Sequence, residues 1–257
     1  MKIHLLTLFP DYFSSPLSEG LMGKAIEDGL AEIHIHDLRK WTHDRHRTAD
    51  DYAFGGGPGM VLKPEPFFEA MDHLGESEGF PPGAPVILTT PQGRRFDRDA
   101  AHELAAGTGF AVLCGRYRGV DERVRQALVT HEYSVGDVIL NGGEAAALLM
   151  VEATVRLLPG VVGEAESAGA DSFETGLLDH PHYTRPAEYR GMRVPDVLLS
   201  GHHAEIALWR RRMVLERTLA RRPDLIEDAE LDADDRAYLE VLRSRKGDAT
   251  AGGSAAE

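Results

Sequence analysis

The sequence predicts an α/β protein followed by a small helical domain. Over residues 1–160, short apolar runs alternate with amphipathic stretches, as a parallel sheet flanked by helices requires. Beyond residue 176 the periodic segments have helical spacing. The composition, 42% apolar and 27% charged, is that of a globular protein, and 257 residues are enough for one large domain plus a smaller unit.

Runs rich in Ile, Val, Leu or Phe predict five strands, at residues 2–8, 32–36, 85–89, 110–114 and 132–135. Amphipathic segments between them predict helices at residues 16–27, 64–74, 97–105 and 121–129. Residues 144–158 are apolar on most faces of a helix, which predicts a core helix. The domain formed by these elements is expected to end at residue 160.

The second half of the chain begins with a segment of different composition. Residues 161–176 are rich in Gly, Ser and acids, which is typical of a flexible linker. Residues 177–246 predict a helical domain, with helices at 203–219, 223–227 and 234–245. Residues 247–257, mainly Gly, Ala, Ser and Asp, predict a disordered tail.

Charge and cysteine usage limit the possible environments and partners. The net charge of −14 argues against binding of nucleic acid by bulk attraction. Residues 200–222, however, hold six arginines against two acids, so a local polyanion site is compatible with the sequence. A single cysteine, Cys114 in an apolar run, predicts a buried structural thiol in a reducing compartment. Without an apolar stretch of about 20 residues or a leader, the sequence predicts a cytoplasmic protein with no membrane partner.

Glycine-bearing loops mark a candidate pocket. Residues 89–93, 115–117 and 136–144 each follow a predicted strand, and ligands of parallel sheets bind beyond the carboxyl ends of the strands. A fourth loop, 54–60, contains four glycines. It lacks the Lys-Ser or Lys-Thr pair of a Walker loop and follows a polar stretch instead of a strand, so a plain flexible loop remains open there.

Several motifs occur in order along the chain: LLTLFP (5–10), HRTADDY (46–52), TPQG (90–93), CGRY (114–117), GDVILNGGE (136–144), HYTRP (182–186) and LSGHH (199–203). With them the chain resembles the TrmD family of bacterial tRNA (guanine-N1)-methyltransferases, in the SPOUT superfamily, from residue 1 to about residue 222. The resemblance implies transfer of a methyl group from S-adenosylmethionine to N1 of the guanosine immediately 3′ of the anticodon, position 37, in tRNA. It also implies a deep trefoil knot in the N-terminal domain and a homodimer with composite active sites.

The resemblance implies the following site residues. Cofactor binding falls on three knot loops: Leu88, Thr89, Thr90, Pro91 and Gly93; Gly115 and Tyr117; Val135, Gly136, Asp137, Val138, Ile139, Leu140, Gly142 and Gly143. Asp171 is the expected general base for the N1 proton, and Arg156 the expected donor to O6, where negative charge builds. Asp179, His182, Arg185, Arg210, Arg211 and Arg217 are expected to contact RNA. Arg212, Arg221 and Arg222 are further candidates for phosphate contacts.

Metal binding is less defined. The family's activity depends on magnesium, so Mg²⁺ is expected, with no ligands assigned. Where the family typically has an acid in Gly-Arg-Tyr-Glu-Gly, this chain has Arg118, which removes any contact made by that acid. By type, Asp179, His180, His182, Tyr183, His202 and His203 are also candidate metal ligands, but their spacing matches no standard zinc pattern.

Two alternatives to this enzyme remain open. One is an RNA-binding or ribosome-assembly protein that keeps the fold without catalysis; Arg118 supports it, whereas Asp171, Arg156 and the glycine loops argue against it. The other is a SPOUT methyltransferase that acts on ribosomal RNA. The match through Tyr183 and the LSGHH motif argues against that target.

Overall fold

The computed structural model describes residues 1–162 and 171–251, with side chains as far as Ser244. The chain divides into two compact units, Met1–Ala165 and Glu166–Glu257, called unit 1 and unit 2 below. The division falls inside the segment 161–176 that the composition predicts to be a linker.

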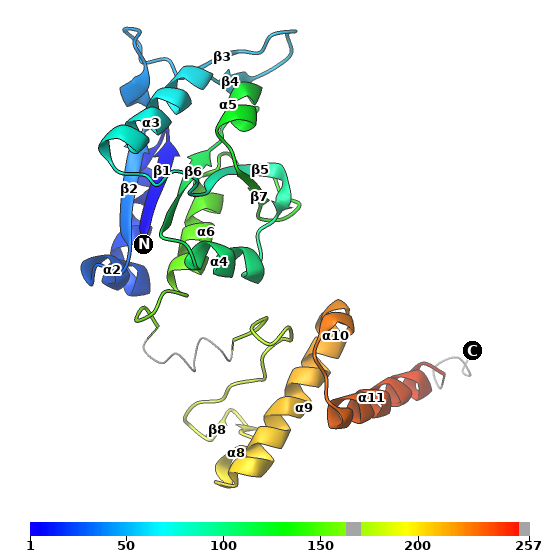
Figure 1. Cartoon of the computed structure of the whole chain (residues 1–257). Coiled ribbons are helices and arrows are strands. Elements are labelled where there is room, and N and C mark those ends of the chain that lie inside the picture. Colours follow the sequence, from blue (N-terminus) through cyan, green and yellow to red (C-terminus); the bar gives the residue numbers. More distant parts are fainter. Residues whose placement is uncertain (163–170, 252–257) are drawn as a thin grey trace. The chain divides into compact units, whose positions relative to one another are not determined.

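Unit 1 is built around a five-stranded parallel sheet with the strand order β2-β1-β6-β5-β7 (Figure 1). The strands are β1 (Lys2–Thr7), β2 (Glu32–Asp37), β5 (Val86–Arg95), β6 (Gly109–Cys114) and β7 (His131–Ser134). The central strand β6 is buried along its whole length, which its continuous apolar sequence GFAVLC permits. The α/β class with a parallel sheet is therefore confirmed.

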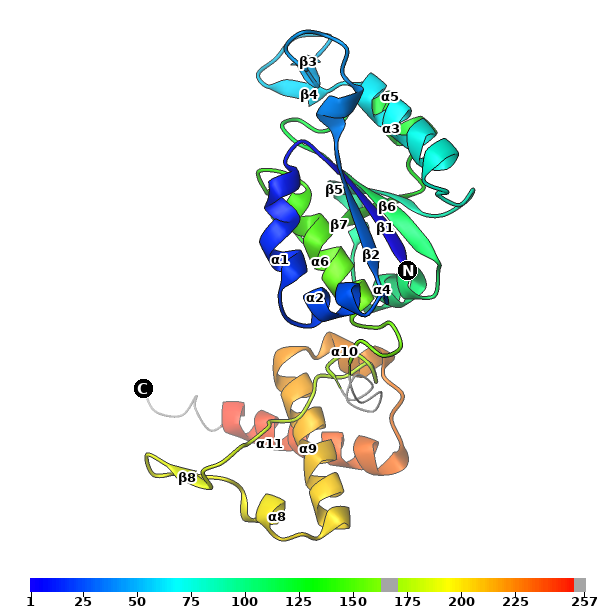
Figure 2. The same ribbon diagram turned by 90° about the vertical axis from the view of Figure 1, so that its left-hand side faces the viewer.

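Helices cover both faces of this sheet (Figure 2). One face carries α1 (Ser14–Ser18), α2 (Gly20–Glu27), α4 (Arg98–Ala105) and α6 (Glu144–Val155), and the other carries α3 (Pro64–Ser77) and α5 (Glu122–Ala127). Each face of the sheet has its own hydrophobic core: the first lies under α1, α2, α4 and α6, and the second under α3 and α5. Because side chains alternate along a strand, Ile3 and Leu5 of β1 pack in the first core and Leu6 packs in the second. Cys114 is fully buried in the first core, and burial raises the pKa of its thiol, as expected of a structural cysteine.

Shorter elements complete unit 1: the 3₁₀ helices η1 (Pro10–Phe13) and η2 (Leu38–Trp41), and an antiparallel pair of β3 (Asp50–Tyr52) and β4 (Met60–Leu62). The glycine-rich loop joins β3 to β4. Gly55, Gly56, Gly57 and Gly59 all have positive φ angles, a conformation that other residues adopt at a cost. The glycines of this loop are therefore explained by the turn that they form.

Unit 2 combines helices with a short hairpin. Its elements are β8 (Glu188–Tyr189), β9 (Met192–Arg193), α8 (Asp196–Leu199), α9 (His203–Arg221), α10 (Asp224–Asp228) and α11 (Ala233–Ala251). A small core of Leu177, Leu215, Ile226 and Leu239 joins α9, α10 and α11. At the start of α11, Asp232 and Asp235 accept hydrogen bonds from each other's backbone N–H groups, at 2.8 and 3.3 Å, which caps the helix.

Three predicted segments differ in the structure, which also contains β3, β4, β8, β9 and α8, none of them predicted. β5 continues to Arg95, beyond the predicted end at residue 89. Helix α11 continues to Ala251, into the segment 247–257 for which composition predicts disorder; residues 247–251 (GDATA) include three weak helix formers, so the extension follows from propagation of the preceding helix. Within the predicted linker, 163–170 lie outside the described residues, whereas a turn closed by the Phe173 N–H and the Leu177 carbonyl, 2.7 Å apart, follows Asp171.

Candidate functional site

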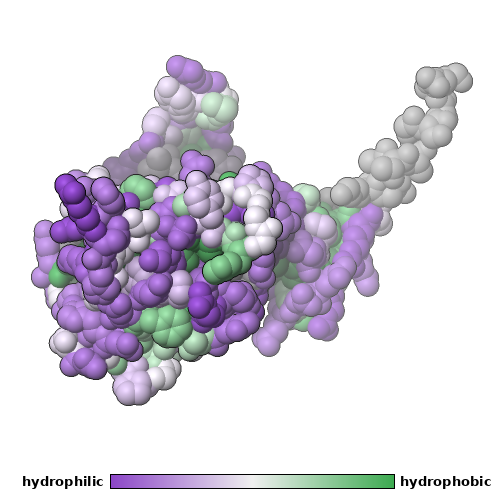
Figure 3. Space-filling model, turned by 90° about the horizontal axis from the view of Figure 1, so that it is seen from above, coloured by the Kyte–Doolittle hydropathy of each residue, from purple (hydrophilic) through white to green (hydrophobic). Residues whose placement is uncertain are grey.

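A cavity of about 510 Å³ lies at the carboxyl ends of β5, β6 and β7. Three loops line it: residues 88–92, 115–120 and 133–143. Figure 3 looks onto this end of unit 1, where hydrophobic residues interrupt a mainly hydrophilic surface. Val138, Ile139 and Leu140 of the third loop are 56%, 83% and 43% exposed, so an apolar wall of the cavity faces solvent. The volume is in the range of pockets that hold small molecules and cofactors.

The first loop is a bulge within β5. The strand pairs with β7 up to Thr89, leaves the ladder, and pairs again with β7 at Arg94 and Arg95. Gly93 closes the bulge against the peptide that joins Glu132 and Tyr133, where a Cβ atom would overlap the backbone. The bulge therefore presents residues 90–92 to the cavity while the strand continues.

The second and third loops are joined to each other. The Gly143 N–H donates to the Gly115 carbonyl at 2.8 Å, and Arg116 and Gly142 form an isolated antiparallel bridge. A Cβ atom on Gly143 would overlap Thr89 Oγ1 and lie 3.0 Å from the Cα atom of Cys114. Residue 143 thus lies between the ends of β5 and β6, and only a glycine fits there.

A buried acid lies beneath the third loop. Glu144, the first residue of α6, is 1% exposed; it accepts hydrogen bonds from Thr7 Oγ1 at 2.8 Å and from Arg116 Nε at 3.2 Å. Arg116 also stacks on Phe9, with its guanidinium carbon 4.0 Å from the ring centroid. This network fixes the second loop to the end of β1 and to the start of α6, so the cavity wall is held by groups far apart in sequence.

Most of the expected cofactor-binding residues line this cavity: Leu88, Thr89, Thr90, Pro91, Gly115, Tyr117, Val135, Val138, Ile139, Leu140, Gly142 and Gly143. Gly93, Gly136 and Asp137 do not. Gly93 packs against β7, and Gly136 has a φ angle of 125°, where the third loop turns away from β7.

Sequence reasoning missed several lining residues, among them Gln92, Arg116, Glu122, Arg125, Ser134 and Asn141. Glu122 and Arg125 form an ion pair on α5, whose i, i+3 spacing was a usable signal. Arg118, at the position where the family typically has an acid, also lines the cavity, and its aliphatic carbons lie against Gly59. The lining thus includes three guanidinium groups.

The expected O6 donor lies away from this cavity. Arg156 caps the carboxyl end of α6, whereas the cavity meets the amino end of that helix. The 12 residues of α6 span about 18 Å at the rise of an α-helix. Just beyond, Gly160 lies beside Leu30, which precedes β2 at the amino end of the sheet. One copy of unit 1 therefore does not bring Arg156 to its own cavity.

The expected base, Asp171, belongs to unit 2, where it is half-buried at the start of the turn that ends at Leu177. Leu177 is 1% exposed in the unit 2 core, so the turn is attached to a packed residue. The Asp171 carbonyl accepts from the Glu174 N–H at 3.2 Å.

The expected RNA-binding residues separate into two groups. His182, Arg185 and Arg210 line a second cavity of about 410 Å³ in unit 2, together with Tyr183 and Trp209. Asp179 holds His182, with 2.6 Å between Oδ2 and Nε2. Burial alone would raise the pKa of Asp179, but the hydrogen bond with His182 helps to lower it below its ordinary value.

The other two arginines make contacts within unit 2. Arg211 is bound to the buried carboxylate of Asp235, with 2.9 Å between Nε and Oδ1, and Arg217 donates to the Asp179 carbonyl at 3.3 Å. Arg210 therefore presents the more available guanidinium of the Arg210–Arg211 pair, because no comparable buried acid holds it among the described contacts.

None of the described helices is long and apolar enough to cross a bilayer.

Comparison with known proteins places these features in one family. Residues 1–228 match the family described as tRNA (Guanine-1)-methyltransferase TrmD. The tRNA (guanine-N(1)-)-methyltransferase of Geobacter metallireducens is 52% identical over 239 residues, 93% of this chain and 96% of that protein. The proteins of the same name from Geotalea uraniireducens and Geobacillus kaustophilus are 53% and 50% identical, over 95% and 93% of this chain and 97% of each relative. The chain belongs to the tRNA (guanine-1)-methyltransferase TrmD family.

Proposed function

We propose that the protein transfers a methyl group from S-adenosylmethionine to N1 of the guanosine immediately 3′ of the anticodon, position 37, in tRNA. The observation that carries this proposal is the cavity between three joined loops in a chain of this family. The names of the relatives, tRNA (guanine-N(1)-)-methyltransferase, support the reaction and the nucleic acid.

The residues of the cavity fit the cofactor. Its volume suits a molecule of nucleoside size, and Val138, Ile139 and Leu140 offer an apolar surface for a purine. Thr90 offers a hydroxyl group, and the glycines allow the backbone to approach a ligand closely. When bound there, S-adenosylmethionine supplies an activated methyl group.

The protein's own groups then handle the proton and the developing charge. N1 of guanine must lose its proton before it can accept a methyl group, and Asp171 is the carboxylate that we assign as general base. As that proton leaves, negative charge builds on O6, and Arg156 donates hydrogen bonds to it. A guanidinium keeps its charge at any working pH, so it suits this second role.

The position of Arg156 supports a homodimer with composite active sites. The length of α6 separates Arg156 from the cavity of the same chain, so we assign this residue to the cavity of a second copy. Asp171 follows α6 in the sequence, and we assign it to the same protomer as Arg156. Each cavity would then work with Arg156 and Asp171 from the partner.

We further propose that unit 1 contains a deep trefoil knot, residues 1–160 forming the methyltransferase domain and residues 177–246 the tRNA-binding domain. The passage of residue 143 between the ends of β5 and β6 supports the knot. Arg185, Arg210, Arg217, Asp179 and His182 contact the RNA, and Arg211 supports α9 by holding Asp235. A protein that modifies tRNA would work in the cytoplasm.

Mg²⁺ is proposed as an activator without protein ligands. Glu122 is the acid among the described residues that line the cavity, and it is ion-paired with Arg125. Arg118 adds a further positive charge where the family typically has an acid.

The test is methylation of tRNA transcripts that differ only in the guanosine beside the anticodon, with labelled S-adenosylmethionine. We expect label only in the transcript that carries this guanosine, and label in neither transcript would refute the proposal. Asp171→Ala is expected to bind S-adenosylmethionine normally in calorimetry and to lose most single-turnover rate, because proton transfer fails. Glu174→Ala, an acid of the same turn, is the matched control and should retain its rate. Wild-type turnover by Asp171→Ala would remove this residue from the role of base.

A further inference from the structure

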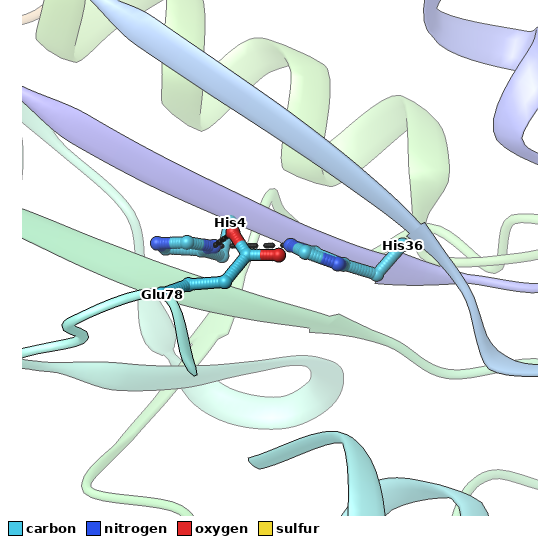
Figure 4. Close-up of side chains that lie close together, drawn as sticks. All are labelled: His4, His36 and Glu78. Atoms are coloured by element: carbon cyan, nitrogen blue, oxygen red, sulfur yellow. Dashed lines mark hydrogen bonds and ion pairs between the residues drawn. The ribbon is translucent and has the colours of Figure 1, made fainter. Parts of the chain in front are cut away.

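A group of histidines lies on β1 and β2, outside the cavity described above. The strand register pairs His4 with His34, and His36 lies two residues farther along β2. Because side chains alternate along a strand, all three imidazoles face the side of the sheet that α3 covers. Glu78, which caps the carboxyl end of α3, points its carboxylate at His4 and His36 (Figure 4).

Three donor atoms of this group converge. His4 Nδ1 lies 3.0 Å from His36 Nε2 and 3.8 Å from Glu78 Oε2, and the three ligand atoms all lie within 4.8 Å of one another. A tetrahedral ion with bonds of about 2.0–2.1 Å holds its ligand atoms about 3.3 Å apart. The two separations from His4 Nδ1, 3.0 and 3.8 Å, differ from that value by about 0.3 and 0.5 Å.

Hydrogen bonding satisfies only one of the two ring nitrogens of His4, because Nδ1 is bonded to His36 Nε2. Its side chain is fully buried on a strand whose neighbouring residues are Ile3, Leu5 and Leu6, and its Nε2 atom has no hydrogen-bond partner. Buried polar atoms without a partner are rare and call for an explanation. Coordination at Nδ1 would replace the hydrogen bond to His36 and fix the tautomer of His4 with its proton on Nε2.

The state of the imidazoles suits coordination. Imidazole binds a metal in its neutral form, through the lone pair of one ring nitrogen, and both rings are buried beside the Glu78 carboxylate. Glu78 is surrounded by imidazoles, with His34 Nδ1 at 3.5 Å and His73 Nε2 at 3.7 Å, which orient its carboxylate. His34 and His73, the two outer histidines, are partly exposed.

We propose that His4, His36 and Glu78 bind one divalent transition-metal ion. Two imidazoles and a carboxylate are a ligand set that zinc takes, with water in the fourth position. The ion would join β1, β2 and the end of α3, three elements that the chain brings together from residues 4, 36 and 78. This site has no part in the proposed methyl transfer; its role is to stabilise unit 1.

The test uses the full chain, stripped of metal with a chelator and then titrated. We expect one Zn²⁺ per chain in calorimetry, the visible absorption of tetrahedral Co²⁺, and a rise of the melting temperature on adding Zn²⁺. Glu78→Gln, at a partly exposed side chain, and His36→Asn should each weaken binding more than 100-fold. Circular dichroism checks that each variant folds. If His36→Asn does not fold, Glu78→Gln alone provides the test.

A matched control uses the other such group among the described residues, formed by Asp179, His180 and His182. The double variant His180→Asn, His182→Asn should bind Zn²⁺ as the wild type does. Loss of the ion in that variant, wild-type affinity in Glu78→Gln, or no bound ion in the wild type would each overturn the proposal. Because the readout is metal binding, none of these results depends on methyltransferase activity.

Discussion

Replacing Gly143 by alanine is expected to destabilise unit 1 by about 3 kcal/mol. The new Cβ would overlap Thr89 Oγ1 and lie 3.0 Å from Cys114 Cα and from the Gly115 nitrogen. Rotation of Thr89 relieves the first contact but breaks its hydrogen bond to the Leu113 carbonyl, which contributes about 1 kcal/mol. The backbone contacts remain as overpacking, which costs about 1–3 kcal/mol. At about 2–4 °C per kcal/mol for a protein of this size, the melting temperature should fall by about 6–12 °C.

Scanning calorimetry without added ligand measures this effect, and Gly115→Ala is the control. A Cβ at Gly115 would lie 3.6 Å from the Thr89 carbonyl oxygen, an ordinary contact, so this variant should stay within about 1 kcal/mol of the wild type. Adding Thr89→Ala to Gly143→Ala should recover part of the loss, which a double-mutant cycle would show as coupling between the two sites. If Gly143→Ala melts together with Gly115→Ala, the close approach of the third loop to the ends of β5 and β6 is wrong.

The remaining predictions concern unit 2. Arg210→Ala should weaken tRNA binding and reduce its salt slope by about one unit in filter binding; an unchanged slope contradicts the phosphate contact. Arg211→Ala should instead lower the free energy of unfolding by about 2 kcal/mol in urea, because Asp235 loses its partner, with partial exposure of Arg211 reducing the cost; a wild-type midpoint contradicts this. The Arg211 hydrogen bonds lower the pKa of Asp235, so this stabilisation is present above the ordinary aspartate pKa and is lost as pH falls through the folded value. In Asp235→Asn, the loss of stability at low pH should lack the contribution of the Arg211–Asp235 pair. An acid transition like that of the wild type would contradict the role given to this pair.

The sheet was predictable because its strands are apolar runs bounded by turn residues. All five predicted strands are present, and their ends differ by a residue or two except in β5. β5 was cut short at residue 89 because Pro91 and Gly93 are typical of a loop, whereas the bulge returns the strand to the ladder. β3 was missed because Asp50 and Asp51 have low strand propensity and depend on β4 for pairing.

Only the position of the cavity was predictable, because it depends on loops that directly follow strands. The sequence places three glycine-bearing loops at strand ends, and the fold brings them together. The buried pairing of Arg116 with Glu144 was not predictable, because no local pattern shows that two charges 28 residues apart will share a buried site. The position of Arg156 was not predictable either, since it depends on where α6 meets the sheet.

The hydrogen bond between Thr7 and Glu144 joins residues 137 positions apart. During synthesis, Thr7 leaves the ribosome long before its partner exists. Strand β1 can pair early with β2, but its other neighbour, β6, and the acid beneath the cavity come much later along the chain. Contacts of such long range slow folding, because the intervening chain must be ordered first. The nascent chain therefore completes its cavity late, and the first strand stays half-paired until β6 has been synthesised.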